Sequence, residues 1–459
     1  MVVLPIGACL VAEAAQRAGH NVRLLDMMFE KRPLKALERE LSAVGPDVVG
    51  FSLRNIDNND MQSPEVYYED LPAAVATVRR LTSAWVVLGG GAVSIMPQAL
   101  LRHSGADLAV LSDGDTVLPQ LLRALERGGD VRAIPRVAWL DGNRMCFAPG
   151  RSPPDLNAAP APAFCSWLNM RPYLSRFASV PVQTKRGCPF ECAYCTYPII
   201  EGRQYRLFSP EVVVDAIRAL ARQGVRDVEF VDNVFNSPYE HALAICRSIA
   251  RANLSMRLQT EDLSPRFVDD DLLDAMSAAG FVGIGITVES ASQPCLEALR
   301  KGFTAEDVRR SAEVVRRHGL PCVWVFMLGG PHETRATVRE TLRFANGCLR
   351  PGDAAFFSVG IRVYPGTEIE KRARTEGQLD GDGLLRPRFY FSTGLDPGWL
   401  MDVLRTSARH NMGFVVPDSL SAPFLPTVQT LAYQFGLRPP LWRHASRLRR
   451  ILKLFGKDV

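Results

Sequence analysis

Three cysteines stand close together in one short segment of the sequence, at Cys188, Cys192 and Cys195. Cysteine thiolates are the usual ligands of iron–sulfur clusters, and a compact loop with these spacings can wrap one four-iron cluster. Gly187 and Pro189 argue against a helix at this point. Three ligands for four irons leave one iron open, where S-adenosylmethionine can bind through its amino and carboxylate groups. An electron from the cluster would then cleave the sulfonium and produce a 5′-deoxyadenosyl radical.

Two other kinds of metal site use closely spaced cysteines, and both fit this segment less well. A structural zinc ion needs four ligands, usually in two close pairs, and no second pair follows here. The nearest downstream candidates are His241 and Cys246. A ferredoxin-type cluster has a different spacing and a fourth cysteine before a proline. The pattern therefore favours a cluster with one open iron.

The cysteine motif, with the aromatic Tyr194 just before its third cysteine, resembles the signature of the radical S-adenosylmethionine (SAM) superfamily. The resemblance implies a 4Fe–4S cluster, SAM as a cofactor, and an external one-electron donor of the flavodoxin or ferredoxin type. Further segments resemble the strand-end motifs of this superfamily in the same order, although the motif at Asp232 departs from the commonest glycine-glycine-glutamate form. The residues that the resemblance assigns to SAM binding are Tyr194, Asp232, Asn233, Glu289, Ser290, Gly330, Pro331 and Arg362.

The composition is that of an ordinary globular protein, long enough for two or three domains. The chain has 459 residues, of which 47% are hydrophobic and 22% are charged. It has no apolar run as long as a membrane span and no signal-peptide pattern, so we expect a cytoplasmic protein. Ten cysteines do not make a disulfide scaffold in a chain of this size. The modest net charge of +5, without a basic stripe interleaved with aromatics, indicates no nucleic-acid partner.

A series of strands and helices surrounds the cysteine motif and is expected to position it, in a domain covering residues 165–387. Ser209 is a good N-cap for the helix that Pro210 begins, and Thr304 with Asp307 approximates a capping box. Six strand–helix units predict a partial (β/α)6 barrel of the TIM type, which keeps its chemistry at the carboxyl ends of the strands. The expected strands are Val182–Thr184, Val228–Val231, Met256–Leu258, Val282–Val288, Cys322–Leu328 and Phe356–Val363.

An earlier series of strands and helices, over residues 1–147, predicts a separate α/β domain with a parallel sheet. Its expected strands are Val22–Leu25, Val48–Ser52, Trp85–Leu88 and Leu108–Leu111. The domain resembles the flavodoxin-like (Rossmann-type) cobalamin-binding domain of one branch of the same superfamily, which implies cobalamin as a third cofactor. A generic nucleotide-binding domain is the alternative. The residues that the resemblance assigns to the cobalamin site are Leu4, Gly7, Ser52, Arg54, Gly89, Gly90, Gly91, Asp113 and Gly114.

Two departures from the cobalamin-binding pattern stand near the start of the sequence. Where such domains carry an axial histidine in an Asp-x-His-x-x-Gly loop, Leu4 occupies the histidine place, so no imidazole can ligate cobalt from there. The second departure is that the first strand should lie upstream of the loop, where the sequence leaves no room for it, so either the given start is too late or the sheet lacks this strand. A sheet that lacks this central strand would expose backbone groups. Apart from these departures, Arg54 lies on a loop expected beneath the corrin. The alternative for this residue is an arginine that forms an ordinary ion pair at the surface.

A proline-rich linker at residues 148–164 and a helical extension at residues 388–459 complete the organisation. The segment Leu441–Phe455 predicts a terminal helix with an apolar face. Its arginines lie elsewhere around the helix, which leaves two interpretations. One is peripheral contact with a membrane surface, and the other is a helix docked on the protein itself.

Cobalamin beside a radical site favours methylation of an unreactive carbon, with one SAM molecule as the methyl source and a second as the radical source. The expected substrate is a small molecule, a lipid or a natural product. A cyclase or other rearrangement enzyme with the same cofactors is the second hypothesis. A non-catalytic cobalamin or cluster sensor is the third, although a sensor does not need the strand-end motifs that position SAM.

Overall fold

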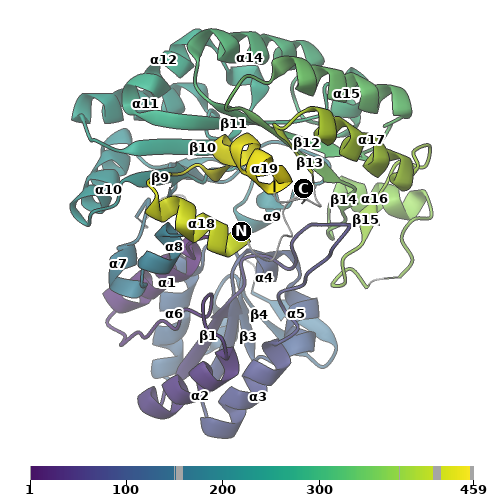
Figure 1. The fold of residues 1–459 in the computed structure, drawn as a ribbon. Coiled ribbons are helices and arrows are strands. Elements are labelled where there is room, and N and C mark those ends of the chain that lie inside the picture. Colours follow the sequence, from purple (N-terminus) through teal and green to yellow (C-terminus); the bar gives the residue numbers. More distant parts are fainter. Residues whose placement is uncertain (1, 149, 151–158, 382, 417–424, 455–459) are drawn as a thin grey trace.

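Two sheets of mainly parallel strands form the framework of the protein, one from the N-terminal part of the chain and one from the remainder (Figure 1). The structure is a computed structural model, and it describes residues 2–148, 150, 159–381, 383–416 and 425–454. Most of the predicted linker at 148–164 lies outside these residues. Within the described ranges, no helix is both long enough and apolar enough to cross a membrane.

The first sheet has the strand order β1-β2-β3-β4-β5, in which β1 to β3 run parallel and β4 and β5 run antiparallel. Its elements are α1 (Ile6–Arg17), α2 (Pro33–Val44), β1 (Val48–Ser52), α3 (Leu71–Leu81), β2 (Trp85–Gly89), α4 (Gly91–Ile95), α5 (Pro97–Ser104), β3 (Leu108–Val110), α6 (Gly114–Glu126), β4 (Val137–Asp141) and β5 (Arg144–Phe147). Adjacent residues of β2 face opposite layers, since Val86 packs with α2 and α3 whereas Val87 packs with α6. Helices therefore cover both faces of this sheet, as in a doubly wound domain.

The strand β1 forms one edge of the first sheet, and Gly50 and Ser52 are exposed there. Among the described residues β1 pairs only with β2. The predicted strand Val22–Leu25 is wrong, because these residues join no ladder. A strand requires a neighbour that accepts and donates its backbone hydrogen bonds, and Val22–Leu25 has none. Among the described residues β1 is thus an edge strand, and an edge strand presents unpaired backbone groups.

The second sheet has seven parallel strands in the order β16-β13-β12-β11-β10-β9-β6. The elements that build it are β6 (Val180–Val182), α10 (Pro210–Arg222), β9 (Asp227–Phe230), α11 (Tyr239–Ala252), β10 (Arg257–Leu263), α12 (Asp270–Ala279), β11 (Phe281–Glu289), α13 (Gln293–Ala298), α14 (Ala305–His318), β12 (Cys322–Leu328), α15 (Arg335–Cys348), β13 (Ala354–Val359), α17 (Pro397–His410) and β16 (Phe414–Val415). The predicted Ser209 N-cap and the capping box of Thr304 and Asp307 are both present. The smaller elements are α7 (Phe164–Trp167), α8 (Arg171–Leu174), β7 (Lys185–Arg186), α9 (Tyr197–Ile200), β8 (Arg206–Leu207), β14 (Ile361–Arg362), α16 (Glu368–Thr375) and β15 (Phe389–Tyr390).

The predicted strand Phe356–Val363 is divided in the structure. Gly360, with φ +76°, ends β13 and turns the chain, so that β14 leaves the sheet and pairs antiparallel with β15. A positive φ costs glycine little, which explains why the break falls at this residue.

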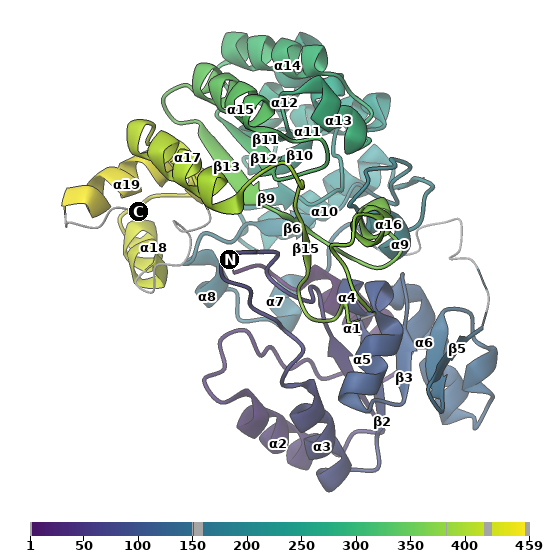
Figure 2. The same ribbon diagram turned by 90° about the vertical axis from the view of Figure 1, so that its right-hand side faces the viewer.

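Helices α10, α11, α12, α14 and α15 cover one face of the second sheet, and the first domain lies on its other side (Figures 1 and 2). Residues of β11 alternate between these sides. Ile284, Ile286 and Val288 belong to the core under the helices, so Gly283 and Gly285 face the opposite, concave side. This alternation sets which side chains of the barrel can meet a ligand.

The end of the chain forms α18 (Leu425–Gln434), a 3-10 turn (Leu441–His444) and α19 (Ala445–Leu454), and the two helices lie next to α17 at one side of the molecule (Figure 2). The buried Trp442 packs with Val323 and Ala354 at the starts of β12 and β13. Arg449 is also buried and donates to the carbonyl oxygens of Phe414 at 2.6 Å and Ala408 at 3.1 Å. The predicted terminal helix is thus present through Leu454, while Phe455 lies outside the described residues.

Candidate active site

The three cysteines lie on a loop whose two ends are held together by the β7–β8 hairpin. The Cys188 amide donates to the Gly202 carbonyl oxygen at 3.0 Å. Gly187 has φ +89°, and a Cβ at this position would lie 2.0 Å from the Gln204 carbonyl oxygen. Only glycine fits this turn, which places the first cysteine just beyond the hairpin.

All three thiols are free, with Cys188 buried and Cys192 and Cys195 half-buried. Burial raises the pKa of Cys195 to about 12, and the neighbouring Cys192 adds to the rise. In the part of the chain that the structure describes, no three His, Cys, Asp or Glu side chains converge on a single metal ion. Thiolates are the usual ligands of iron–sulfur clusters, so the chemistry of three free cysteines on one loop fits the predicted cofactor.

Tyr194, which precedes the third cysteine, joins two buried charges at the carboxyl end of β11. Its hydroxyl donates to Glu289 Oε1, and Lys301 Nζ lies 2.8 Å from the hydroxyl and 3.3 Å from Glu289 Oε1. Glu289 stands beside a bulge and has φ +64°, and strained backbone of this kind clusters at functional sites. Burial lowers the pKa of Lys301, but Glu289 and the nearby thiols more than reverse this, so the net pKa is raised. The sequence predicted Tyr194 and Glu289 and missed Lys301.

Asp232 and Asn233, at the carboxyl end of β9, are occupied by protein partners. Asp232 accepts from the Thr184 amide at 2.8 Å and from its hydroxyl at 2.7 Å, and it forms an ion pair with the buried Lys185 at 3.7 Å. Asn233 donates to Glu201 Oε2 at 2.9 Å, and the same oxygen accepts from the Gly187 amide at 2.9 Å. Burial raises the pKa of Glu201. These side chains therefore support the base of the cysteine loop.

The remaining predicted SAM residues lie at the carboxyl ends of β11 and β12 and on β14. Glu333 accepts from the Gly329 amide and, at 3.1 Å, from the Gly330 amide, which shapes the turn before Pro331. Ser290 Oγ lies 3.2 Å from Thr341 Oγ1, inside the protein.

Arg362 is buried and makes its strongest contact with the first domain. Its Nε donates to Asp57 Oδ2 at 2.7 Å, and its terminal nitrogens donate to the carbonyl oxygens of Val363 at 2.6 Å and Leu384 at 2.9 Å. The sequence missed Asp57, because the two partners are 305 residues apart.

The glycine turn of the first domain follows β2 at Gly89, Gly90 and Gly91. Gly90 has φ +100°, and a Cβ there would lie 2.3 Å from the Leu53 carbonyl oxygen, whereas a Cβ on Gly89 would meet nothing within 4 Å. The turn therefore packs tightly on the loop that carries Arg54 and follows Ser52, both of which are exposed. Gly7 lies in the first turn of α1 and Gly114 begins α6, while Leu4 is buried in the core at 2% exposure.

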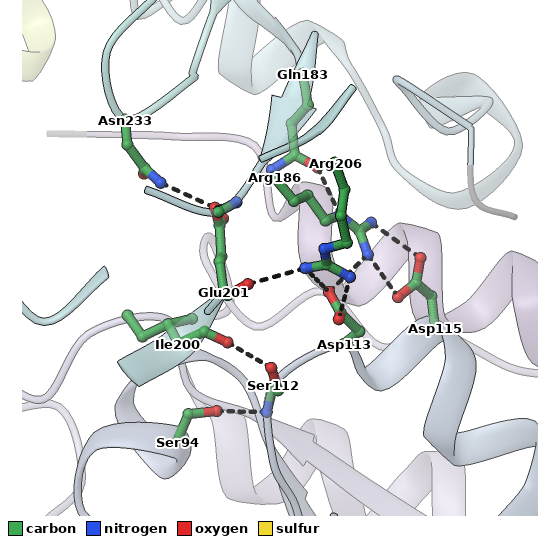
Figure 3. Close-up of polar contacts among 11 residues, drawn as sticks. Ser94, Ser112, Asp113, Asp115, Gln183, Arg186, Ile200, Glu201, Arg206 and Asn233 are labelled. Carbon is green, nitrogen blue, oxygen red and sulfur yellow. Dashed lines mark hydrogen bonds and ion pairs between the residues drawn. The ribbon is translucent and has the colours of Figure 1, made fainter. Parts of the chain in front are cut away.

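A set of buried charges, which we call the domain joint, connects the first domain to the cysteine loop (Figure 3). It consists of Asp113 and Asp115 from the first domain and Arg186 and Arg206 from the hairpin. Arg186 donates to Asp113 at 3.0 Å and to both carboxylate oxygens of Asp115 at 2.9 Å. Arg206 donates to Asp113 at 2.6 Å, and the nearby Ser112 hydroxyl donates to the Ile200 carbonyl oxygen at 2.6 Å. The joint fixes the cysteine loop against the first sheet, and it engages Asp113, which the sequence assigned to cobalamin.

The sequence matches the B12 binding domain family over residues 1–122 and the Radical SAM superfamily over residues 182–345. The structure of the radical SAM methyltransferase TsrM from Kitasatospora setae, with cobalamin and a [4Fe–4S] cluster bound, matches with a TM-score of 0.85. The two proteins are 23% identical, and the match covers 99% of this chain and 97% of TsrM.

Two curated relatives extend the comparison. The hopanoid C-3 methylase of Methylococcus capsulatus is 27% identical over 367 residues, which is 79% of this chain and 67% of the methylase. The anaerobic magnesium-protoporphyrin IX monomethyl ester cyclase of Rubrivivax gelatinosus is 24% identical over 345 residues, which is 71% of this chain and 58% of the cyclase. With the family matches, the predicted two-domain fold and the three predicted cofactors are confirmed.

Proposed function

Because the chain is a cobalamin-dependent radical SAM enzyme, with a B12-binding domain and a radical SAM domain, we propose that it methylates an unactivated carbon of a small-molecule substrate. The observation that carries the proposal is the contact between the two cofactor-binding turns. Helix α9, just after Cys195, packs against α4, just after Gly90, and a Cβ on Gly91 would lie 3.5 Å from Ile200 Cδ1. Two cofactors held at these turns would face one space, into which a substrate would enter.

The residues at the strand ends supply binding and orientation in this proposal. Tyr194, Glu289 and Lys301 form a charged, hydrogen-bonded set beside the cysteine loop, which suits the polar groups of SAM. Ser290, Gly330 and the other predicted contacts would complete that site. When bound, the cluster and cobalamin supply the radical and methyl-transfer chemistry, and the protein's share is to orient the reactants and exclude water.

The proposal also assigns a role to Arg54 on the first domain. Leu4 is buried in the hydrophobic core and offers no ligand to cobalt. The charge of Arg54 acts on Tyr197 and on Glu229 of β9, so its guanidinium lies in the space between the domains. An arginine keeps its positive charge at every working pH. Its charge would therefore favour the less cationic, more reduced states of a cobalt ion held nearby.

A matched pair of glycine variants tests the cobalamin site. Gly90→Ala should weaken cobalamin binding about tenfold or more, because its Cβ would collide with the Leu53 carbonyl oxygen at a positive φ. Gly347→Ala, in α15 and outside the predicted cobalamin site, should bind normally, since its Cβ would meet nothing within 4 Å. Absorbance titration of the cobalamin-free protein measures both affinities. If the two variants bound cobalamin with equal affinity, this turn would not be part of the cobalamin site.

Product analysis tests the reaction class. Methylation of a C–H bond consumes two SAM molecules and two electrons from an external donor of the flavodoxin or ferredoxin type. It yields the methylated product, S-adenosylhomocysteine, 5′-deoxyadenosine and methionine, with the substrate hydrogen in the deoxyadenosine. We therefore expect one S-adenosylhomocysteine and one 5′-deoxyadenosine per turnover, measured by mass spectrometry with methyl-labelled SAM. S-adenosylhomocysteine without deoxyadenosine would mean a polar methyl transfer instead.

The second hypothesis, a cyclase or rearrangement, is supported by the similarity to the Rubrivivax gelatinosus cyclase. Deoxyadenosine together with a rearranged, unmethylated product would establish it. The sensor hypothesis predicts no deoxyadenosine at all after reduction. Of the two interpretations of the C-terminal helix, the burial of Arg449 against α17 and β16 supports a helix docked on the protein.

A further inference from the structure

Carboxylate side chains gather on the concave side of the second sheet, away from the cysteine loop. Val228 and Phe230 of β9, and Leu258 and Thr260 of β10, are buried toward the helices or within the sheet, so the residues between them face the concave side. These concave-side positions carry Glu229, Gln259 and Glu261.

Asp262 joins this set because the ladder between β10 and β11 is irregular there. The register shifts between Thr260 and Leu263, and bulges of this kind re-aim side chains. Thr287 of β11 donates to Asp262 Oδ1 at 3.2 Å, and alternation places Thr287 on the concave side. We call Glu229, Gln259, Glu261 and Asp262 the acceptor cluster.

The C-terminal segment closes one end of the space next to the acceptor cluster. Trp442 packs at the starts of β12 and β13, and a Cβ on Gly283 would lie 2.8 Å from its ring. The indole is close enough to Glu261 to lower the pKa of that carboxyl. The three carboxylates are half-buried, so solvent still reaches them.

The carboxylates of the acceptor cluster have no ion-pair partner at close range. Within the described ranges no Lys, Arg or His lies within ion-pair distance of Glu229, Glu261 or Asp262, and the cations that act on them do so at longer range, Arg54 on Glu229 and Lys301 on Asp262. Arg257, on the same face of β10, is held by Asp227 through contacts of 2.7 and 2.5 Å. Burial, reinforced by the neighbouring carboxylates, raises the pKa of Glu261 to about 8. Burial likewise raises the pKa of Asp262 to about 7.

Gln259 provides an independent sign that a hydrogen-bond donor is missing. Its side chain is 6% exposed, and its Nε2 donates to Glu229 Oε2 at 3.0 Å. Its Oε1 is buried and has no partner among the described residues. Buried polar atoms are nearly always hydrogen-bonded, so an orphaned acceptor beside carboxylates calls for a donor from outside the chain.

We propose that the acceptor cluster binds a basic group of the substrate, a protonated amine or guanidine, and so selects a cationic small molecule over a neutral lipid. The N–H donors of such a group would satisfy Gln259 Oε1 and neutralise Glu229 and Glu261 together. Hydrogen bonds in which one partner is charged are stronger than hydrogen bonds between neutral groups, above all in a partly desolvated site. The inference rests on the proposed function, because it assigns a substrate class to the same enzyme.

SAM is itself a cation and is the competing occupant. Asp262 lies within electrostatic range of Glu289 and Lys301, at the predicted SAM site, as well as of Glu229 and Glu261. The charged groups that act on Glu261 are Glu229 and Asp262, and the one that acts on Glu229 is Arg54, so these two carboxylates lie farther from the predicted SAM site. The double variant Glu229→Gln/Glu261→Gln should therefore leave the affinity for SAM unchanged. If the variant lost affinity for SAM and for amines to a comparable extent, the cluster would belong to the SAM site and the proposal would be overturned.

Calorimetric titration of the holoenzyme, with both cofactors and SAM bound, tests the inference. The probes are butylamine, phenethylamine and tyramine, monoamines that each lose their charge on N-acetylation, and each is paired with its N-acetylated form. The amines should bind about tenfold or more tightly than their uncharged acetyl forms. They should also release protons near pH 7, because a bound cation lowers the raised carboxyl pKa values. The double variant should lose this preference, and Glu211→Gln, on an exposed part of α10, should retain it.

The outcomes separate this inference from the proposed function. Binding of no amine, equal binding of the acetyl forms, or undiminished amine binding by the double variant would overturn the inference. Circular dichroism, iron content and cobalamin content of the double variant show that a loss of binding is not a loss of folding. Methylation of a neutral substrate would overturn the substrate class and leave the methyltransferase intact. Amine binding together with a rearranged, unmethylated product would overturn the methyltransferase and leave the substrate class intact.

Discussion

Replacing Cys188, Cys192 and Cys195 together with alanine should leave anaerobically reconstituted protein with essentially none of the roughly four irons expected per chain. The three thiols are free and share one loop, so the triple variant loses every cysteine ligand that this loop supplies. Because SAM cleavage needs the reduced cluster, 5′-deoxyadenosine formation should fall to background. Iron and sulfide analysis, with mass spectrometry of the reduced protein plus SAM, measures both losses.

The other cysteines provide matched controls for this experiment. Cys165 is exposed, and Cys246 is buried in the core of the second domain. Cys165→Ala and Cys246→Ala should both keep their iron, the second with some loss of stability from the small cavity. Full iron retention by the triple variant would show that the cluster is held elsewhere.

Removing the central arginine of the domain joint should destabilise the protein by about 3–5 kcal/mol, the usual cost of breaking a buried ion pair from one side. Arg186→Met leaves Asp115 without its ion-pair partner and takes one of the two arginines from Asp113. The uncompensated carboxylate remains buried in a low-dielectric interface. Urea unfolding of the holoprotein, followed by circular dichroism, measures the change in free energy of unfolding.

Two further variants identify the cause of that loss. Arg203→Met removes an exposed arginine that lies 4.0 Å from Glu191, and it should change the free energy by less than about 0.5 kcal/mol. Arg186→Met/Asp115→Leu removes both charges and should recover about 1 kcal/mol or more of the deficit. A single Arg186→Met variant as stable as the parent would show that the joint does not hold the domains together.

Features encoded by neighbouring residues could be predicted from the sequence. The cysteine loop, the Ser209 cap and the capping box at Thr304 depend on residues a few positions apart, and all three appear in the structure. Strand Cys322–Leu328 was predicted with its observed bounds, because a buried parallel strand is a continuous apolar run.

Features that depend on distant residues could not be predicted. Lys301 meets Tyr194 across 107 residues, and Arg186 meets Asp113 across 73. No local pattern marks such pairs, since a lysine or arginine in a short loop is ordinarily exposed. The error at Val22–Leu25 has the same origin: its apolar alternation suits a strand, but a strand also needs a neighbour.

The ion pair between Asp57 and Arg362 has a consequence for the order in which the protein is made. Its partners are 305 residues apart, so at about 5–20 residues per second a ribosome needs roughly 15–60 s after Asp57 to reach Arg362. During that interval the nascent first domain carries a carboxylate whose counter-charge does not yet exist. The domain can collapse early, but it reaches its final state only when the last strands of the barrel have been synthesised. Completion of the N-terminal domain is thereby coupled to synthesis of the segment that contains Arg362.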